Sequence, residues 1–346
     1  MKKLFCFVLC LCMIGGMALS ASAATDLFTV ENPALISTEV PQESVEIATV
    51  DLTTGETTYS TITYTPELTL FSDGTVGKFH QGWFPEVSGD SLQDGGATTY
   101  SVIGSDERTK VTNTKNWPYS AICCFDTEYT NKDGELKESG GTAWMIGSNL
   151  AVTAAHCIYD RASGNDKSII GFWPGKKGEG NGFFNSHNPF GNIAVTKIKY
   201  PVNYQTNSDV KYDWAVLVLA ENIGDETGWF SYSFRQSYPT NQTYTITGYP
   251  FDDAVDKYYM YTASGIVCTG DADEHATTYY HEIDTESGQS GAPMYDSDYV
   301  VYGIHRGNSN PDDPDNPNYA VRITLEIHTC LERINEIEEI TGSVYS

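Results

Sequence analysis

The sequence predicts an all-β fold, a sandwich or barrel, with one helix near its C-terminal end. Short runs of alternating apolar residues recur from Ser101 onward and are separated by turn residues, as in "YSAICCF", "LAVTAAHC", "WAVLVLA", "YTITGYP", "YVVYGIHRG" and "YAVRIT". The 346 residues include 31 Gly and 23 Tyr, which favours turns and strands. No alternation of strands with amphipathic helices is visible, so a parallel α/β fold is not expected.

The predicted helix covers residues 325–340, "LEIHTCLERINEIEEI". Polar residues separate the apolar ones there at helical spacing. The apolar stripe consists of Leu325, Ile327, Leu331, Ile334 and Ile337.

The N-terminus has the pattern of a secretory signal peptide. Lys2 and Lys3 precede the apolar run "LFCFVLCLCMIGGMAL", which is followed by the small residues "SASAA". We expect residues 1–23 to be removed and the protein to be secreted and extracellular. No second apolar run of about 20 residues follows, so a membrane protein is not expected.

Residues 24–100 differ in composition from the rest of the chain. They contain no Cys and one basic residue, Lys78, and they are rich in Thr, Ser and Glu. We interpret them as a propeptide, with residues 101–346 as the main domain. The alternative is an N-terminal β-hairpin that belongs to the main domain, and composition does not decide between the two.

The formal net charge of the whole chain is −26. Such a surface repels nucleic acid phosphates and anionic lipid, so neither is an expected partner. The composition is otherwise that of a globular protein, with 40% hydrophobic residues.

Ser290 lies in "IDTESGQSGAP", residues 283–293, between Gly288 and Gly291. Glycines allow a tight turn in which a serine hydroxyl is exposed and neighbouring N–H groups point outward. The alternative is an ordinary β-turn, in which Gly and Ser are common. A nucleophilic serine requires a base, and the base requires an orienting group.

His156 and Asp213 are the candidates for these two roles. His156 ends the strand-like run "LAVTAAHC", and Asp213 directly precedes "WAVLVLA". Either residue alone is weak evidence, but the order His156, Asp213, Ser290 predicts a catalytic triad. The imidazole would take the serine proton, the carboxylate would fix the imidazole tautomer, and the N–H groups of Gly288 and Ser290 would form an oxyanion hole.

These motifs resemble those of the chymotrypsin-type serine proteases, and more narrowly the secreted bacterial glutamyl endopeptidases. The resemblance rests on "SVIGSDERTKVTNTKNWPY", "GTAWMIGSNLAVTAAHCIYD", "TITGYP", "SGQSGAP" and "YAVRIT", and it covers most of the chain after Ser101. It implies two packed antiparallel β-barrels, at about 101–225 and 226–330, and a C-terminal helix. It also implies a monomeric serine endopeptidase that acts on polypeptide substrates and needs no cofactor.

Two features depart from the wider superfamily. Gln289 stands where trypsin-like enzymes carry the Asp that receives the new N-terminal amine, so activation must differ. The half-cystine expected near Gly141–Thr142 is missing. Cys157 must therefore pair elsewhere or stay free, and the pairing we expect is with Cys123 or Cys124. The other cysteines after the signal peptide are Cys268 and Cys330.

Three residues bear on substrate specificity. Asp284 lies six residues before Ser290, where a carboxylate would favour cleavage after Lys or Arg. Thr285 and His305 can donate hydrogen bonds to a substrate carboxylate. The resemblance assigns these two to recognition of Glu, which is the specificity we expect.

Maturation would occur near Tyr100–Ser101. Tyr100 is not acidic, so a Glu-specific enzyme would not readily cut after it. We therefore expect a separate activating protease. The acidic loop containing Asp312, Asp313 and Asp315 has no EF-hand spacing, and we expect no metal site. A non-catalytic binding protein on a protease scaffold remains the alternative outside enzymes.

Overall fold

A computed structural model describes residues 42–64, 68–72, 75–84, 106–178, 187–237, 242–251, 258–268, 277–308 and 317–344, and the statements below concern these ranges. Three predictions fall outside them: the signal peptide over residues 1–23, the maturation site at Tyr100–Ser101, and the acidic loop with Asp312, Asp313 and Asp315.

The first sheet has eight strands in the order β11-β6-β7-β8-β13-β12-β1-β2, and neighbouring strands are antiparallel. Its strands are β1 (Glu43–Asp51), β2 (Thr57–Tyr64), β6 (Ile122–Thr130), β7 (Leu136–Met145), β8 (Leu150–Thr153), β11 (Ser168–Pro174), β12 (Val195–Pro201) and β13 (Ala215–Leu219). A small separate ladder joins β9 (Tyr159–Asp160) to β10 (Asn165–Asp166).

The second sheet contains a closed barrel. Strand β18 pairs with both β15 and β19, which closes the ring β18-β15-β16-β17-β20-β19. Strands β14, β4 and β3 continue from β19, and β5 pairs with β16. The bounds are β3 (Thr69–Leu70), β4 (Val76–His80), β5 (Thr109–Lys110), β14 (Ser231–Arg235), β15 (Thr243–Gly248), β16 (Tyr261–Cys268), β17 (Thr278–His281), β18 (Pro293–Tyr295), β19 (Val300–Asn308) and β20 (Asn318–Arg322).

The helices are short except for the last. They are α2 (Asn203–Thr206), α3 (Gly224–Thr227) and α4 (Leu325–Val344), with 3₁₀ turns η1 (Tyr119–Ala121), η2 (Ala155–Cys157) and η3 (Val210–Tyr212). The predicted helix is confirmed and extends four residues beyond Ile340. Ile327, Leu331 and Ile334 are buried as predicted, whereas Ile337 is 46% exposed.

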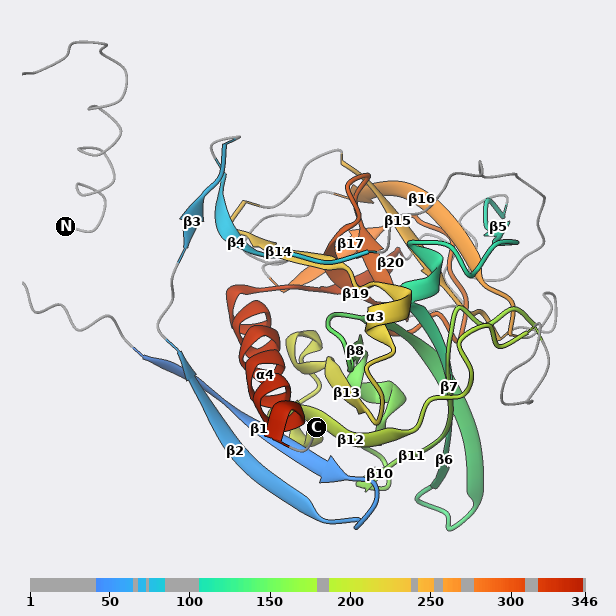
Figure 1. Ribbon diagram of the computed structural model, residues 1–346, viewed down its shortest axis with the longest axis vertical. Helices are drawn as coiled ribbons and strands as arrows, with labels where there is room; N and C mark the ends of the chain where they lie inside the picture. Colours follow the sequence, from blue (N-terminus) through green and yellow to red (C-terminus); the bar gives the residue numbers. More distant parts are fainter. Residues whose placement is uncertain are drawn as a thin grey trace, which may run out of the picture. The chain divides into compact units, whose positions relative to one another are not determined.

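The predicted all-β fold with a C-terminal helix is confirmed (Figure 1). The strands of the first sheet end at Leu219, and β14 begins at Ser231. The domain boundaries near residues 100 and 225 stay predictions. One large apolar core joins side chains of both sheets and of α4, with Trp144 and Trp214 fully buried, and a smaller core fills the closed barrel.

The segment that composition assigns to a propeptide takes part in both sheets. Strand β1 pairs with β12 at the edge of the first sheet, and β4 pairs with β14 in the second. Figure 1 shows the β1–β2 hairpin, in blue, beside the red helix α4. The described strands of the segment therefore extend both sheets, and its assignment as a propeptide stays a prediction.

The predicted disulfide between Cys157 and Cys123 or Cys124 is wrong. Cys123, Cys124, Cys157 and Cys330 are buried, and none of them is in a disulfide. The Cys157 thiol donates to the Ser290 carbonyl at 3.7 Å. It also packs against Gly141, where an added Cβ would lie 3.0 Å from Sγ. The thiol thus faces a glycine on β7, and neither cysteine of β6 is bonded to it.

Reductant should therefore leave the stability of the protein unchanged. Loss of a native disulfide typically costs about 2–5 kcal/mol, and free thiols incur no such loss. We expect the same Tm, within about 1 °C, with and without dithiothreitol. Alkylation in denaturant without reductant, followed by mass spectrometry, should label Cys123, Cys124, Cys157 and Cys330. A Tm that falls by several degrees in reductant would contradict the free-thiol assignment.

Candidate active site

The turn that carries Ser290 lies between β17 and β18 and contains two glycines with positive φ. Gly288 has φ +90° and Gly291 has φ +89°, a conformation that L side chains rarely adopt. The space is closed as well, because a Cβ on Gly291 would lie 2.2 Å from the Thr142 carbonyl oxygen. The pattern "GQSG" thus provides the two glycines that this backbone requires.

Thr142, on β7 of the first sheet, fixes the turn in place. Its N–H donates to the Ser290 carbonyl at 2.9 Å, and its hydroxyl donates to the Gly288 carbonyl at 2.9 Å. The same hydroxyl oxygen accepts from the Tyr249 N–H at 2.9 Å. On the other side of the turn, the Gly291 N–H donates to the His305 carbonyl at 2.7 Å. Both sheets therefore hold the predicted nucleophile.

His156 and Asp213 are in direct contact. His156 lies in η2 directly after β8, and Asp213 lies between η3 and β13; because β8 and β13 are neighbouring strands, the two residues meet at one end of the sheet. The His156 N–H donates to Asp213 Oδ1 at 2.8 Å, and His156 Nδ1 lies 2.9 Å from Asp213 Oδ2. Asp213 is 1% exposed, while the His156 side chain is 31% exposed.

This contact shifts the pKa values of both groups. Burial raises the pKa of Asp213, but the charge and hydrogen bonds of His156, followed by Arg306, outweigh burial and lower it to about 2. Burial lowers the pKa of His156, but the Asp213 carboxylate outweighs burial and raises that pKa above its ordinary value. Asp213 is therefore ionised at neutral pH and stabilises an imidazolium next to it.

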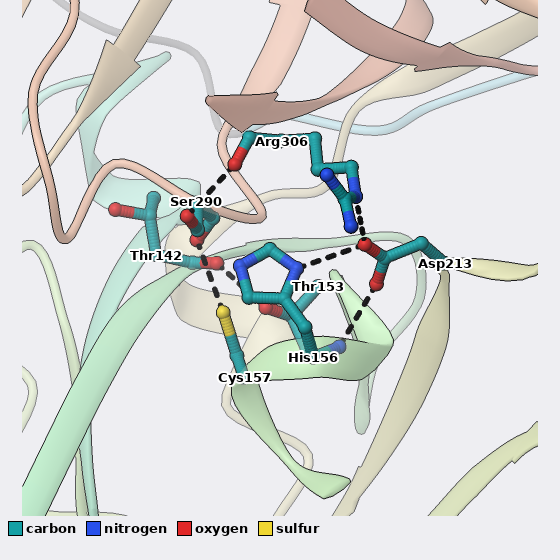
Figure 2. A network of polar contacts seen from close by, with 7 residues as sticks. All are labelled: Thr142, Thr153, His156, Cys157, Asp213, Ser290 and Arg306. Carbon is teal, nitrogen blue, oxygen red and sulfur yellow. Dashed lines mark hydrogen bonds and ion pairs between the residues drawn. The ribbon is translucent and has the colours of Figure 1, made fainter. Parts of the chain in front are cut away.

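Arg306, on β19, connects the three predicted residues (Figure 2). Its Nε donates to Asp213 Oδ2 at 2.5 Å, the oxygen that also contacts the His156 ring. The Ser290 hydroxyl donates to the Arg306 carbonyl at 3.0 Å. Among the described residues, the hydroxyl of Ser290 makes no hydrogen bond to His156, so the serine is turned toward β19.

The predicted oxyanion-hole donors are unoccupied by protein groups. Within the described ranges, the N–H groups of Gly288 and Ser290 donate no hydrogen bond, whereas the carbonyls of both residues are bonded to Thr142. Two N–H groups without protein acceptors can bind an anionic oxygen.

His305 lies on β19 and is 1% exposed. Its Nδ1 lies 3.3 Å from Nε2 of His281, a fully buried histidine on β17. Burial, and then His281, lower the pKa of His305 well below its ordinary value. An imidazolium at His305 is thus disfavoured. The neutral ring can still donate one hydrogen bond.

Asp284 and Thr285 follow β17 and are also buried, at 4% and 1% exposure. Asp284 Oδ2 accepts a hydrogen bond from the Glu107 N–H at 2.7 Å. The carboxylate that could favour Lys or Arg substrates is therefore engaged in holding the segment near Glu107.

Sequence reasoning did not identify Arg306, His281 or Thr142. Arg306 directly follows His305, but its partner Asp213 lies 93 positions away in the sequence. His281 lies three positions before Asp284, but its partner His305 lies 24 positions away. Thr142 entered the sequence analysis only because an expected half-cystine is absent near Gly141–Thr142. No local pattern marks these three residues, because their roles depend on contacts between strands.

The family of the chain follows from a comparison with known families. The model of the trypsin family, described as "Trypsin", matches residues 108–328, well over half of the chain. The chain belongs to this family. The match includes His156, Asp213, Ser290 and the strands from β5 to β20, whereas β1, β2, β3 and β4 lie outside it.

The chain is also similar to individual known proteins. The chain is 33% identical over 198 residues to a glutamyl endopeptidase of Bacillus licheniformis. The alignment covers 57% of this chain and 55% of that protein, so the similarity spans little more than half of the relative's length. It is 26% identical over 237 residues to an extracellular metalloprotease of Bacillus subtilis, covering 67% and 69%. A solved structure of a Glu endopeptidase in complex with MPD aligns with a TM-score of 0.57 and 30% identity, covering 68% of this chain and 99% of that one.

Among the described residues, no group of three His, Cys, Asp or Glu side chains is arranged to hold a metal ion. No helix in the same ranges has the length and apolar character needed to cross a membrane.

The contact between Arg306 and Asp213 predicts a change in the titration of His156. Arg306 places a positive charge on the carboxylate oxygen that His156 also contacts, which offsets part of the stabilisation of the imidazolium. Arg306→Gln removes that charge, so the pKa of His156 should rise by roughly 1 pH unit. NMR titration of the His156 ring protons measures it. Arg333→Gln, on the exposed side of α4, is the matched control and should change nothing; an unchanged or lower pKa in Arg306→Gln would contradict the electrostatic role.

Proposed function

We propose that this protein is a secreted serine endopeptidase that uses His156, Asp213 and Ser290 as its triad. The observation that carries the proposal is the double hydrogen bond between His156 and the buried Asp213, next to a serine held on a two-glycine turn. His156 acts as the base that accepts the Ser290 proton and returns it to the leaving amine. Asp213 holds the ring so that Nδ1 carries the proton and Nε2 is free to act.

Attack on a peptide carbonyl requires the Ser290 hydroxyl to leave the Arg306 carbonyl and turn to His156. The carbonyl oxygen of the substrate becomes an oxyanion during attack. The N–H groups of Gly288 and Ser290, which have no acceptor among the described residues, would bind it. Loss of one such donor typically costs about a hundredfold to a thousandfold in rate.

The substrate class is polypeptides, with cleavage preferred after Glu. Thr285 and the neutral His305 are the donors that would bind the substrate carboxylate. Asp284 accepts from the Glu107 N–H and is thereby engaged elsewhere, which weighs against the Lys/Arg alternative. Two compared proteins carry the name glutamyl or Glu endopeptidase, which supports the same direction.

The enzyme is made as a proenzyme in this proposal. Residues 1–23 direct secretion, residues 24–100 form the propeptide, and a separate protease cuts at Tyr100–Ser101. Thr285 and His305 are each 1% exposed. Both side chains are therefore covered in the uncut chain, and in this proposal the cut at Tyr100–Ser101 makes them accessible to substrate.

A panel of chromogenic peptides tests the proposal. Matched peptides ending in Glu, Asp, Lys, Arg or Phe are offered to the chain after cleavage at Tyr100–Ser101. We expect the highest kcat/KM with Glu, a loss of at least about a thousandfold in Ser290→Ala, and a loss in His305→Ala that is larger for Glu than for Phe.

Other results of this panel have defined meanings. A preference for Lys or Arg would assign specificity to Asp284. Absence of hydrolysis in a folded, correctly cut protein would favour the binding-protein alternative. Circular dichroism of Ser290→Ala and His305→Ala, compared with the parent chain, verifies that folding is intact.

Purified proenzyme should not mature itself. Tyr100 offers no carboxylate to Thr285 and His305, so incubation alone should leave the Tyr100–Ser101 bond intact over hours. Mass spectrometry of the N-termini follows the reaction, and Ser290→Ala incubated in parallel detects contaminating protease. Efficient cleavage after Tyr100 that disappears in Ser290→Ala would contradict either the Glu preference or the need for a separate activating protease.

A further inference from the structure

We propose that the N-terminal strap, defined as residues 42–64 and 75–84, stays bound to the protease domain as a second, non-covalently held chain after the cut at Tyr100–Ser101. The partner surface is formed by β12, β14 and α4. This inference rests on the proposed maturation, because only a cut chain can release the strap.

The first attachment is a β-ladder at the edge of the first sheet. Strand β1 pairs with β12 from Ile47↔Pro201 to Asp51↔Lys197, and β2 pairs with β1 along eight residue positions. Without β1, the N–H and C=O groups of the β12 edge would lose their partners. Such an edge pairs readily with other strands, so its coverage is of value to a secreted protein.

Apolar burial accompanies this ladder. Six side chains of the strap belong to the large core that also contains strands of the protease domain, and each is at most 8% exposed. They are Val45, Ile47, Ala48, Val50, Ile62 and Tyr64. Release of the strap would return these side chains to water and open the core beneath them, so the apolar contribution favours retention.

The second attachment is to β14. Strand β4 pairs with it from Tyr232↔His80 to Arg235↔Gly77. At Gly77 the strands approach so closely that a Cβ would lie 2.0 Å from the Phe234 carbonyl oxygen. The ring of His80 stacks on Tyr232 with centroids 4.5 Å apart.

Contacts beyond the ends of β4 extend this attachment. Trp83 and Trp229 exchange two backbone hydrogen bonds, of 3.0 and 2.6 Å, and their rings lie 5.2 Å apart. The Gly82 N–H donates to the Ser231 hydroxyl at 2.9 Å, and the Ser233 hydroxyl donates to the Lys78 carbonyl at 2.9 Å. Two attachments on one segment act together, because the release of one leaves the other in place.

Helix α4 provides an ionic contact with the strap. Lys78, the one basic residue of the segment 24–100, forms an ion pair with Glu332. Both side chains are partly buried, at 24% and 22% exposure. The pair joins the strap to the last helix of the domain in addition to the two ladders.

The described residues of the strap make no hydrogen bond to the predicted triad. None of its described residues hydrogen-bonds to His156, Asp213, Ser290 or Arg306. Its attachments lie on β12, β14 and α4 instead. Its role is therefore to complete the two sheets, and it can remain in place while the site works.

The test uses the full chain with the recognition sequence of an added site-specific protease inserted between residues 90 and 100. Ser290→Ala in this chain prevents self-digestion and makes the result independent of activity. After the cut, size-exclusion chromatography and native mass spectrometry at micromolar and then about a hundredfold lower concentration should find both fragments together at a ratio of 1:1. Release of the N-terminal fragment, whether the remainder stays folded or precipitates, overturns the proposal.

Charge reversal at the ion pair gives a sharper comparison. Lys78→Glu places a carboxylate against Glu332, and the cut complex should release its N-terminal fragment at least about tenfold faster. Lys78→Glu with Glu332→Lys should restore slow release. Tyr59→Glu, at a side chain that is 58% exposed on β2, is the control and should behave as the parent. Equal release rates in all four proteins would overturn the assigned contact.

The retention experiment and the test of the proposed function can fail independently of each other. Retention is measured with an added protease and an inactive nucleophile, so it can hold even if Tyr100–Ser101 is not the natural cut. Activity on Glu peptides, measured with Ser290 intact, tests the enzyme by itself.

Discussion

Thr142 makes the hydrogen bonds on which the geometry of the candidate site depends. Its N–H and hydroxyl hold the carbonyls of Ser290 and Gly288, its hydroxyl oxygen accepts from Tyr249, and its own carbonyl accepts from the Thr153 hydroxyl at 2.8 Å. One residue of the first sheet thereby fixes the turn between β17 and β18 relative to the end of β8, after which His156 follows. A serine and a histidine on different sheets need such a connection, because side-chain reach alone does not fix their relative positions.

Asp213 has a comparable role for the charges of the site. It is nearly fully buried and accepts from the backbone and the ring of His156 and from Arg306. A buried carboxylate is tolerated when its oxygens are satisfied in this way. The arrangement fixes the imidazole more firmly than a single bond would, and it places a permanent cation next to the pair. The charge balance of the proposed triad thus includes a fourth group, Arg306.

Much of the fold could be predicted because its information is local. Alternating apolar runs indicate strands, and the apolar spacing over residues 325–340 indicates the helix. The order of His156, Asp213 and Ser290 in the chain also suggested that they meet, and the structure brings them close together. The remaining features depend on long-range register. The pairing of β1 with β12, the reach of Arg306 to Asp213 and the thiol of Cys157 facing Gly141 each join segments that no local pattern relates. The expected disulfide was wrong for the same reason.

The hydrogen bond from the Ser290 hydroxyl to the Arg306 carbonyl has a further consequence. That carbonyl lies on β19 and accepts from the Ser290 hydroxyl at 3.0 Å. An extended peptide that lies along β19 would bring an amide N–H to the same oxygen. The amide would then compete with the Ser290 hydroxyl for that oxygen, and in the proposed mechanism the displaced hydroxyl turns to the ring of His156. Binding of the peptide would thus exchange one donor for another at the Arg306 carbonyl and release the Ser290 hydroxyl for attack. Without a peptide, the hydroxyl would stay hydrogen-bonded to that carbonyl.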